Sequence, residues 1–186
     1  MLCDHDYNWV ITDVAVGNIK AGSDLAHLKQ IGISVIVCVV PQLPHGLEVY
    51  KQQGFALLHI PIDDSPEVDI GRWFDGASDF IMAHRLMGRK VLVHCHAGIS
   101  RSTASAAILM AQFNPGRETD AFLRLLDLRP HAWPNTRLVE LADDQLARNG
   151  ALMTGLLAYR RAMLARKPHL RDVIRNIGRG HELPTE

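Results

Sequence analysis

The stretch that most constrains the fold is residues 91–102, VLVHCHAGISRS, where an apolar run stops at a cysteine and an arginine follows six positions later. Val91–Val93 is short, uncharged and rich in β-branched residues, which predicts a strand buried on both faces of a mostly parallel sheet. Residues 102–111, STASAAILMA, contain many good helix formers and predict a helix. The loop between them therefore joins the carboxyl end of a strand to the start of a helix.

Such a junction predicts an anion site. Backbone N–H groups at a helix start lack intrahelical partners and carry the positive end of the helix dipole. Five residues separate Cys95 from Arg101, enough for one turn of backbone around a tetrahedral oxyanion, and Gly98 lets the chain approach it closely. The same field should favour the thiolate of Cys95, the reactive form. Arg101 offers a planar fork that can hold two phosphate oxygens.

The rest of the chain alternates between strand and helix patterns. We expect strands at residues 10–12, 14–16, 34–40 and 55–60, and helices at residues 23–30, 70–87, 118–128 and 136–148. Ser23, Asp69 and Asn135 are placed to cap three of these helices. The alternation predicts an α/β fold with a central, mostly parallel sheet flanked by helices and followed by a C-terminal helical extension.

Composition excludes some classes of protein. The 186 residues carry 20 basic and 20 acidic side chains, so zero net charge gives no reason to expect a nucleic-acid partner. No apolar run approaches the ~20 residues that span a bilayer, and the N-terminus lacks a signal-like pattern. We therefore expect a cytoplasmic protein without a transmembrane segment. Of the three cysteines, Cys38 lies inside a buried-strand pattern and is expected to be a small core residue.

An acidic loop, IPIDDSPEVDI at residues 60–70, precedes the helix expected at residues 70–87. Two of its carboxylates, Asp63 and Asp64, come before the predicted cap Asp69. From the residues alone they are either solvated loop carboxylates or a general acid for the cysteine site.

The motif His94-Cys95-x-x-Gly98-x-x-Arg101-Ser102 resembles the signature of cysteine-dependent protein phosphatases, and residues 97–102 resemble the dual-specificity branch in particular. The resemblance covers residues 9–148. It implies that Asp64, 31 positions before the cysteine, is the general acid, with Asp63 as the alternative.

The resemblance also implies the remaining roles. Cys95 is the nucleophile, Ser102 helps the thiolate to leave, and His94 orients the loop and stabilises the thiolate, although a purely structural histidine is an equally good interpretation. The phosphate-binding loop consists of His96, Ala97, Gly98, Ile99, Ser100 and Arg101. No metal or cofactor is implied, because no second ligand cluster with zinc spacing accompanies the His-Cys-His triplet.

The implied activity is phosphomonoester hydrolysis through a phosphocysteine intermediate, with a phosphorylated protein or peptide as substrate. One alternative is a catalytically silent phosphate-binding module. Another is a phosphatase of a non-protein phosphomonoester such as a phosphoinositide, which the absence of Lys and Arg from the variable loop positions disfavours. A rhodanese-like sulfurtransferase also uses a loop cysteine, but the terminal Arg-Ser and the upstream acid favour phosphoryl transfer.

Two later segments complete the prediction. Arg129-Pro130 and Pro134-Asn135 resemble the family's block beneath the phosphate loop, with Trp133 where an aliphatic residue is more usual. Asn149-Gly150 suggests a boundary between a catalytic domain at residues 1–149 and a basic helical extension at residues 150–186, where seven cationic residues face three acidic ones. The extension is either a packed helix with a basic solvent face or a docking element for an acidic partner or an anionic membrane surface.

Overall fold

The computed structural model describes residues 6–62 and 71–184. The strands of this part are β1 (Tyr7–Ile11), β2 (Val14–Gly17), β3 (Ile33–Val39), β4 (Ala56–Ile60) and β5 (Lys90–Cys95). The α-helices are α1 (Ile19–Ser23), α2 (Leu25–Gln30), α3 (Leu47–Gln52), α4 (Phe74–Leu86), α5 (Arg101–Phe113), α6 (Glu118–Leu128), α7 (Thr136–Gln145), α8 (Ala151–Arg166) and α9 (Leu170–Asn176). Two short 3₁₀ helices are η1 (Gly71–Trp73) and η2 (Gly180–Glu182).

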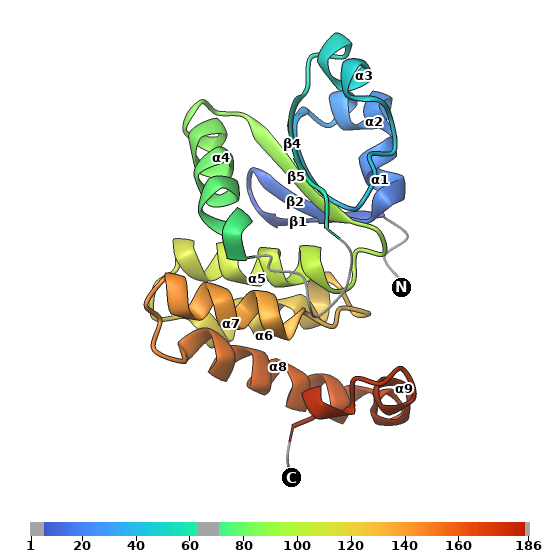
Figure 1. Ribbon diagram of the computed structural model, residues 1–186. Coiled ribbons are helices and arrows are strands. Elements are labelled where there is room, and N and C mark those ends of the chain that lie inside the picture. The colour runs from blue at the N-terminus through green and yellow to red at the C-terminus, as the bar shows by residue number, and fades with distance from the viewer. Residues whose placement is uncertain (1–5, 63–70, 185–186) are drawn as a thin grey trace.

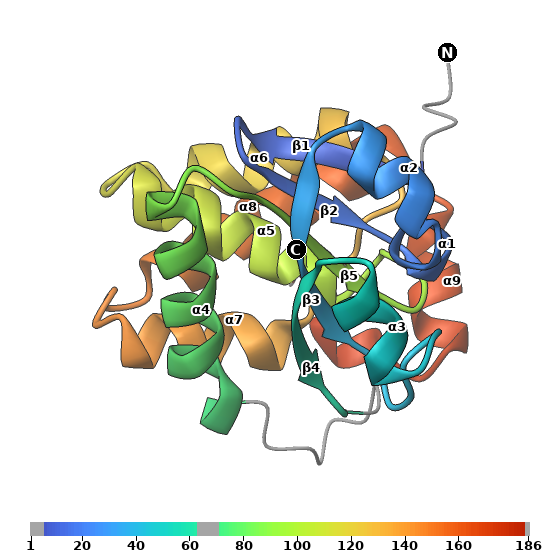
Figure 2. The same ribbon diagram turned by 90° about the horizontal axis from the view of Figure 1, so that it is seen from above.

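The strands form one sheet in the order β1-β2-β5-β3-β4. All neighbouring pairs are parallel except β1 and β2, which are antiparallel. Strand β5 is therefore the middle strand of the sheet, between β2 and β3 (Figure 2). This arrangement confirms the predicted α/β fold, and it places Cys95 at the carboxyl end of the central strand.

Helices cover both faces of the sheet (Figure 1). Alternate residues of the central strands point to opposite sides: Val93 and Cys95 belong to the larger core, which also takes in residues of α5 to α8, whereas Leu92 and Cys38 belong to a smaller core with residues of α2 and α3. Cys38 is completely buried, as predicted for a small core residue. It and Cys95 are both free thiols on opposite faces of the sheet.

The helix expected at residues 23–30 is in fact two short helices, and the predicted Ser23 cap is wrong. Asn18 caps α1 and Asp24 caps α2, each side chain accepting the backbone N–H three residues further on. Carboxamide and carboxylate oxygens at these positions satisfy the helix starts, and the Ser23 hydroxyl donates back to the Ile19 carbonyl instead. Helix α3 was not predicted.

The predicted caps of the later helices have different outcomes. Asn135 caps α7 as expected, because its side chain accepts the N–H of Leu138 at 2.9 Å. Helix α7 ends at Gln145, three residues before the predicted end. Asp69 lies outside the described residues.

Helix α8 packs along α6 and α7 on the far side of the larger core (Figure 1). Its inner face, Leu152, Leu156, Tyr159 and Met163, is fully buried. Buried Asp143 near the end of α7 accepts the N–H of Leu152 at 2.7 Å and so joins the two helices. The extension then continues through α9 to η2. No helix in the described part of the chain is long and apolar enough to cross a membrane.

Candidate active site

The loop between β5 and α5 surrounds the Cys95 thiol, which is only 3% exposed as a residue. The backbone N–H of Gly98 donates to Cys95 Sγ at 3.2 Å, and Ser102 Oγ lies 3.3 Å from the same sulfur. The loop thus directs one N–H and one hydroxyl at the sulfur, which are the groups that stabilise a thiolate.

Any residue other than glycine would be strained at position 98 of the loop. Its φ of +69° is in the left-handed region, and a Cβ would lie 2.6 Å from Arg129 Nη2 and 3.1 Å from the backbone nitrogen of Asn18. Arg129 Nη2 donates to the Gly98 carbonyl at 3.1 Å, and its Nη1 donates to Asn8 Oδ1 at 3.0 Å. One guanidinium therefore ties the tightest bend of the loop to β1.

Arg101 begins α5 and is 5% exposed. Its Nη1 donates to the carbonyl of Ile62 at 2.6 Å. Ile62 directly precedes the acidic loop, so this bond joins the phosphate loop to the base of the segment that carries Asp63 and Asp64. Both aspartates lie outside the described residues, and the assignment of the general acid stays a prediction.

His94 points to the opposite face of β5 from the cysteine and is fully buried. Its ring packs directly on α1, because a Cβ on Gly22 would lie 2.4 Å from His94 Nε2. Neither ring nitrogen makes a hydrogen bond within the part of the chain that the structure describes. Burial lowers the pKa of His94 to about 4, and the adjacent backbone of Cys95 offsets this only in part. The ring is therefore neutral at pH 7, and it contributes volume rather than charge beneath the loop.

The remaining loop positions divide into a rim and a buried part. His96, Ala97 and Ile99 are exposed, whereas Gly98 and Ser100 are buried. The side chain of His96 is thus at the rim of the loop.

Neighbouring segments bind the carbonyl oxygens of the loop from outside. The backbone N–H of Ile19 donates to His96 O at 3.0 Å, Trp133 N–H donates to Ile99 O at 2.9 Å, and Asn135 N–H donates to Ser100 O at 3.2 Å. The loop carbonyls are thus bound from outside, which is the arrangement that a loop needs if its N–H groups are to bind an anion at its centre. The block at residues 129–135 lies beneath the phosphate loop, as the resemblance implies.

Residues 14–143 match the family model described as dual specificity phosphatase, catalytic domain. The chain belongs to the dual specificity phosphatase family. It is 36% identical to mouse dual specificity protein phosphatase 2 over 110 residues, 58% of this chain and 32% of the relative. It is 33% identical to mouse dual specificity protein phosphatase 12 over 122 residues, 64% of this chain and 35% of the relative. The match thus spans about a third of the length of these curated relatives.

Solved structures give the same family. The crystal structure of human tyrosine phosphatase-like serine/threonine/tyrosine-interacting protein superposes with a TM-score of 0.66 and 28% identity, over 77% of this chain and 97% of that one. The structure of DUSP15 superposes with a TM-score of 0.66 and 27% identity, over 83% and 93% of the two chains. These similarities confirm the resemblance inferred from the cysteine motif.

Some residues around the loop were not found from the sequence. Gly22 carries no local signal, because its importance comes from the ring of His94 on another strand. Asn18 could have been identified as a helix cap from the sequence, because asparagine is a favoured cap residue and it directly follows the strand that ends at Gly17. Glu182, which lies beneath Trp133, is 49 residues away in sequence and gives no sign of this contact.

Proposed function

We propose that this protein is a cysteine-dependent phosphatase that hydrolyses phosphotyrosine, and with it phosphoserine or phosphothreonine, through a phosphocysteine intermediate. The observation that carries the proposal is the set of contacts at Cys95. Its sulfur accepts the N–H of Gly98, lies 3.3 Å from Ser102 Oγ, and sits at the start of a loop that ends at the buried Arg101.

In the first step Cys95 Sγ attacks phosphorus in line with the leaving group. The S–P bond forms as the P–O ester bond breaks, and the leaving oxygen takes the electron pair of that bond and a proton from Asp64. The loop N–H groups and the Arg101 guanidinium hold the equatorial oxygens, where negative charge is spread in the transition state. A positioned general acid of this kind contributes about 10²–10⁴-fold in rate.

In the second step the Asp64 carboxylate takes a proton from water as the water oxygen attacks phosphorus. The O–P bond forms, the S–P bond breaks, and the electron pair returns to sulfur. Ser102 Oγ and the Gly98 N–H are the two groups within 3.3 Å of the sulfur that stabilise the departing thiolate.

The rim of the loop supports a protein substrate. His96, Ala97 and Ile99 are its exposed positions, and none of them is a lysine or arginine that would bind a second phosphate of an inositol ring. Ile99 presents an apolar side chain that is 38% exposed, which suits contact with an aromatic ring better than with a polyanion.

A silent phosphate-binding module is the second candidate. The human tyrosine phosphatase-like serine/threonine/tyrosine-interacting protein shares this fold, and its name describes an interacting protein. The combination of Cys95, Arg101 and Ser102 with an upstream aspartate favours the enzyme.

The test is hydrolysis of para-nitrophenyl phosphate with EDTA present, across pH, for the wild type, Cys95→Ser and Asp64→Ala, with Asp63→Ala as the matched control. We expect no turnover by Cys95→Ser, and we expect Asp64→Ala alone to lose about 10²–10⁴-fold in kcat together with the basic limb of the pH profile. If Asp63→Ala shows that pattern instead, the acid is Asp63. A wild type that binds phosphate but hydrolyses neither this ester nor phosphotyrosine peptides would establish the binding module.

For the basic extension, a packed structural role is better supported than docking to an acidic partner. Part of its positive charge is used inside the fold, because Arg160 and Arg179 contact the buried Glu182. Arg166 and Arg175 pair with Asp127 and Asp172 at the surface. For the location, the cytoplasm is our proposal, and the free thiols of Cys38 and Cys95 fit a reducing compartment.

A further inference from the structure

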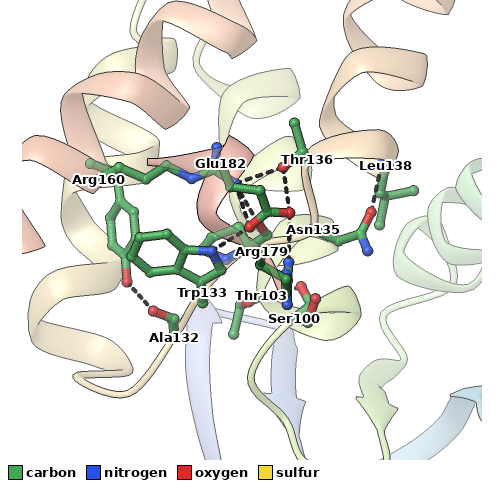
Figure 3. A network of polar contacts seen from close by, with 12 residues as sticks. Ser100, Thr103, Ala132, Trp133, Asn135, Thr136, Leu138, Arg160, Arg179 and Glu182 are labelled. Atoms are coloured by element: carbon green, nitrogen blue, oxygen red, sulfur yellow. Dashed lines mark hydrogen bonds and ion pairs between the residues drawn. The ribbon is translucent and has the colours of Figure 1, made fainter. Parts of the chain in front are cut away.

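A buried carboxylate from the C-terminal extension lies beneath the segment that supports the phosphate loop. Glu182 in η2 is 7% exposed, and four side chains converge on it (Figure 3). Trp133 Nε1 donates to Oε2 at 2.5 Å and Thr136 Oγ1 donates to Oε1 at 2.9 Å. Arg179 Nη2 lies 2.8 Å from Oε1, and Arg160 Nη2 lies 3.3 Å from Oε2. Oε1 thus has the Thr136 hydroxyl and Arg179 beside it, and Oε2 has the Trp133 indole N–H and, as an ion pair, Arg160.

Trp133 connects this carboxylate to the phosphate loop. Its side chain donates to Glu182, while its backbone N–H donates to the Ile99 carbonyl at 2.9 Å. Two residues on, the Asn135 N–H donates to the Ser100 carbonyl at 3.2 Å. Ile99 and Ser100 directly precede Arg101. Only the residue Trp133 therefore separates the Glu182 carboxylate from the backbone of the phosphate loop.

The cluster holds these groups in one arrangement. Arg160 Nη2 also donates to Thr136 Oγ1 at 2.6 Å, and its guanidinium lies over the Trp133 ring, 5.2 Å from the centroid. Burial raises the pKa of Glu182, but hydrogen bonds from Arg179 and Trp133 and the charge of Arg160 outweigh it, so the pKa lies below its usual range and the group is ionised at neutral pH. Well-packed apolar side chains often stabilise a core as well as a buried ion pair does, so stability alone does not call for a carboxylate here.

We propose that Glu182 is a positioning residue for the phosphate loop, acting through the Trp133 indole and the backbone of residues 133–135 on the carbonyls of Ile99 and Ser100. The proposal rests on the proposed function, since it concerns how firmly that loop holds a phosphoryl group. It also gives the C-terminal extension a part in the active site, although the extension lies beyond the residues that match the family model.

The test compares Glu182→Gln with the wild type for binding of tungstate, a phosphate mimic, by calorimetry, and for kcat and KM on para-nitrophenyl phosphate. Gln keeps the shape but removes the charge that orients four donors. We expect the tungstate affinity of the folded variant to fall about tenfold, which is the change in affinity that corresponds to the loss of one charge-assisted hydrogen bond. Circular dichroism and thermal melts establish that the variant is folded at the assay temperature.

Two further variants separate positioning from stability. Leu152→Ala truncates a fully buried residue at the start of α8, about two turns before Arg160, and it should lower Tm without changing tungstate affinity. Trp133→Phe keeps a ring but removes the indole N–H. We expect the single variant Trp133→Phe to weaken tungstate binding. In the double variant, adding Glu182→Gln should then weaken tungstate binding very little further.

Unchanged tungstate affinity in folded Glu182→Gln would overturn the proposal, as would an equal loss of affinity in Leu152→Ala. Full additivity of Trp133→Phe and Glu182→Gln would show that the carboxylate does not act through the indole and would overturn it also. A wild type that binds tungstate without hydrolysing the ester overturns the proposed function only, because the coupling is still measured by binding. A wild type that binds no tungstate overturns both.

Discussion

The chemical groups of the phosphate loop come from eight consecutive residues, Cys95–Ser102, whereas the groups that hold the loop come from β1, α1, residues 129–136, α8 and η2. The loop presents its sulfur, N–H groups and guanidinium to one small volume, so local backbone geometry is sufficient to bring them together. Its supports bind the outer side of the same backbone from distant parts of the chain. The two regions should therefore respond differently to substitution. Changes in the loop remove rate, whereas changes in the supports mainly remove stability, except where a support is bonded through Trp133 to the loop carbonyls, as Glu182 is.

Among the substitutions that test this comparison, the largest expected effect is that of Arg101→Lys, which keeps the positive charge but removes the planar fork. We expect kcat/KM for para-nitrophenyl phosphate to fall by about 10²–10³-fold, the cost of one transition-state donor. Because the residue belongs to the loop, the free energy of unfolding in urea should change by less than about 1 kcal/mol. A large loss of stability with little loss of rate would place Arg101 among the supports, where its bond to Ile62 would be its main role.

The next effect is a pH dependence of stability from His94. Its pKa in the fold is about 4, below its ordinary value of 6.5, so between these values the unfolded chain binds more protons. The stability is therefore complete above pH 6.5 and is lost as the pH falls towards 4, by about 3 kcal/mol in total. Urea titrations from pH 7 to pH 4 measure it, with His94→Leu as the control that should lack most of this slope. Equal slopes in both proteins would contradict the prediction.

Gly22→Ala should be destabilising without a direct effect on chemistry. The new methyl group would lie 2.4 Å from His94 Nε2, and overpacking of this kind costs about 1–3 kcal/mol. Gly76→Ala is the control: Gly76 is a helical position in α4 with open space around it, and Ala there should stabilise the fold by up to about 1 kcal/mol. Thermal melts of both variants give the signs, and a neutral Gly22→Ala would mean that the ring of His94 can move away.

The same difference between the two regions explains what the sequence could predict. The strand, loop and helix around Cys95 follow from local patterns, as does the Asn135 cap, because the interacting groups lie within a few residues of each other. The Ser23 cap was wrong because two stronger caps, Asn18 and Asp24, flank it.

The supports depend on contacts between distant residues, and local patterns carry no record of them. In the sequence, Glu182 is one acidic residue in a basic C-terminal segment. The only sequence feature that points to its role is Trp133, which stands where the family more usually has an aliphatic residue. Asp64 is a different case: its assignment came from resemblance and spacing, and it lies outside the described residues.

Tyr159→Phe should have the smallest effect, and it tests whether every support reaches the loop. The Tyr159 hydroxyl donates to the Ala132 carbonyl at 2.7 Å, next to Trp133, and both groups are buried. Removing it should lower the free energy of unfolding by about 1 kcal/mol, with kcat/KM unchanged, because this bond fixes α8 to the supporting segment without touching a loop carbonyl. Tyr50→Phe is the control, since the buried Tyr50 hydroxyl makes no hydrogen bond within the described residues and its loss should be nearly neutral. If Tyr159→Phe lowered kcat/KM, the segment would transmit any disturbance to the loop, and the Trp133 indole would have no special part in the coupling.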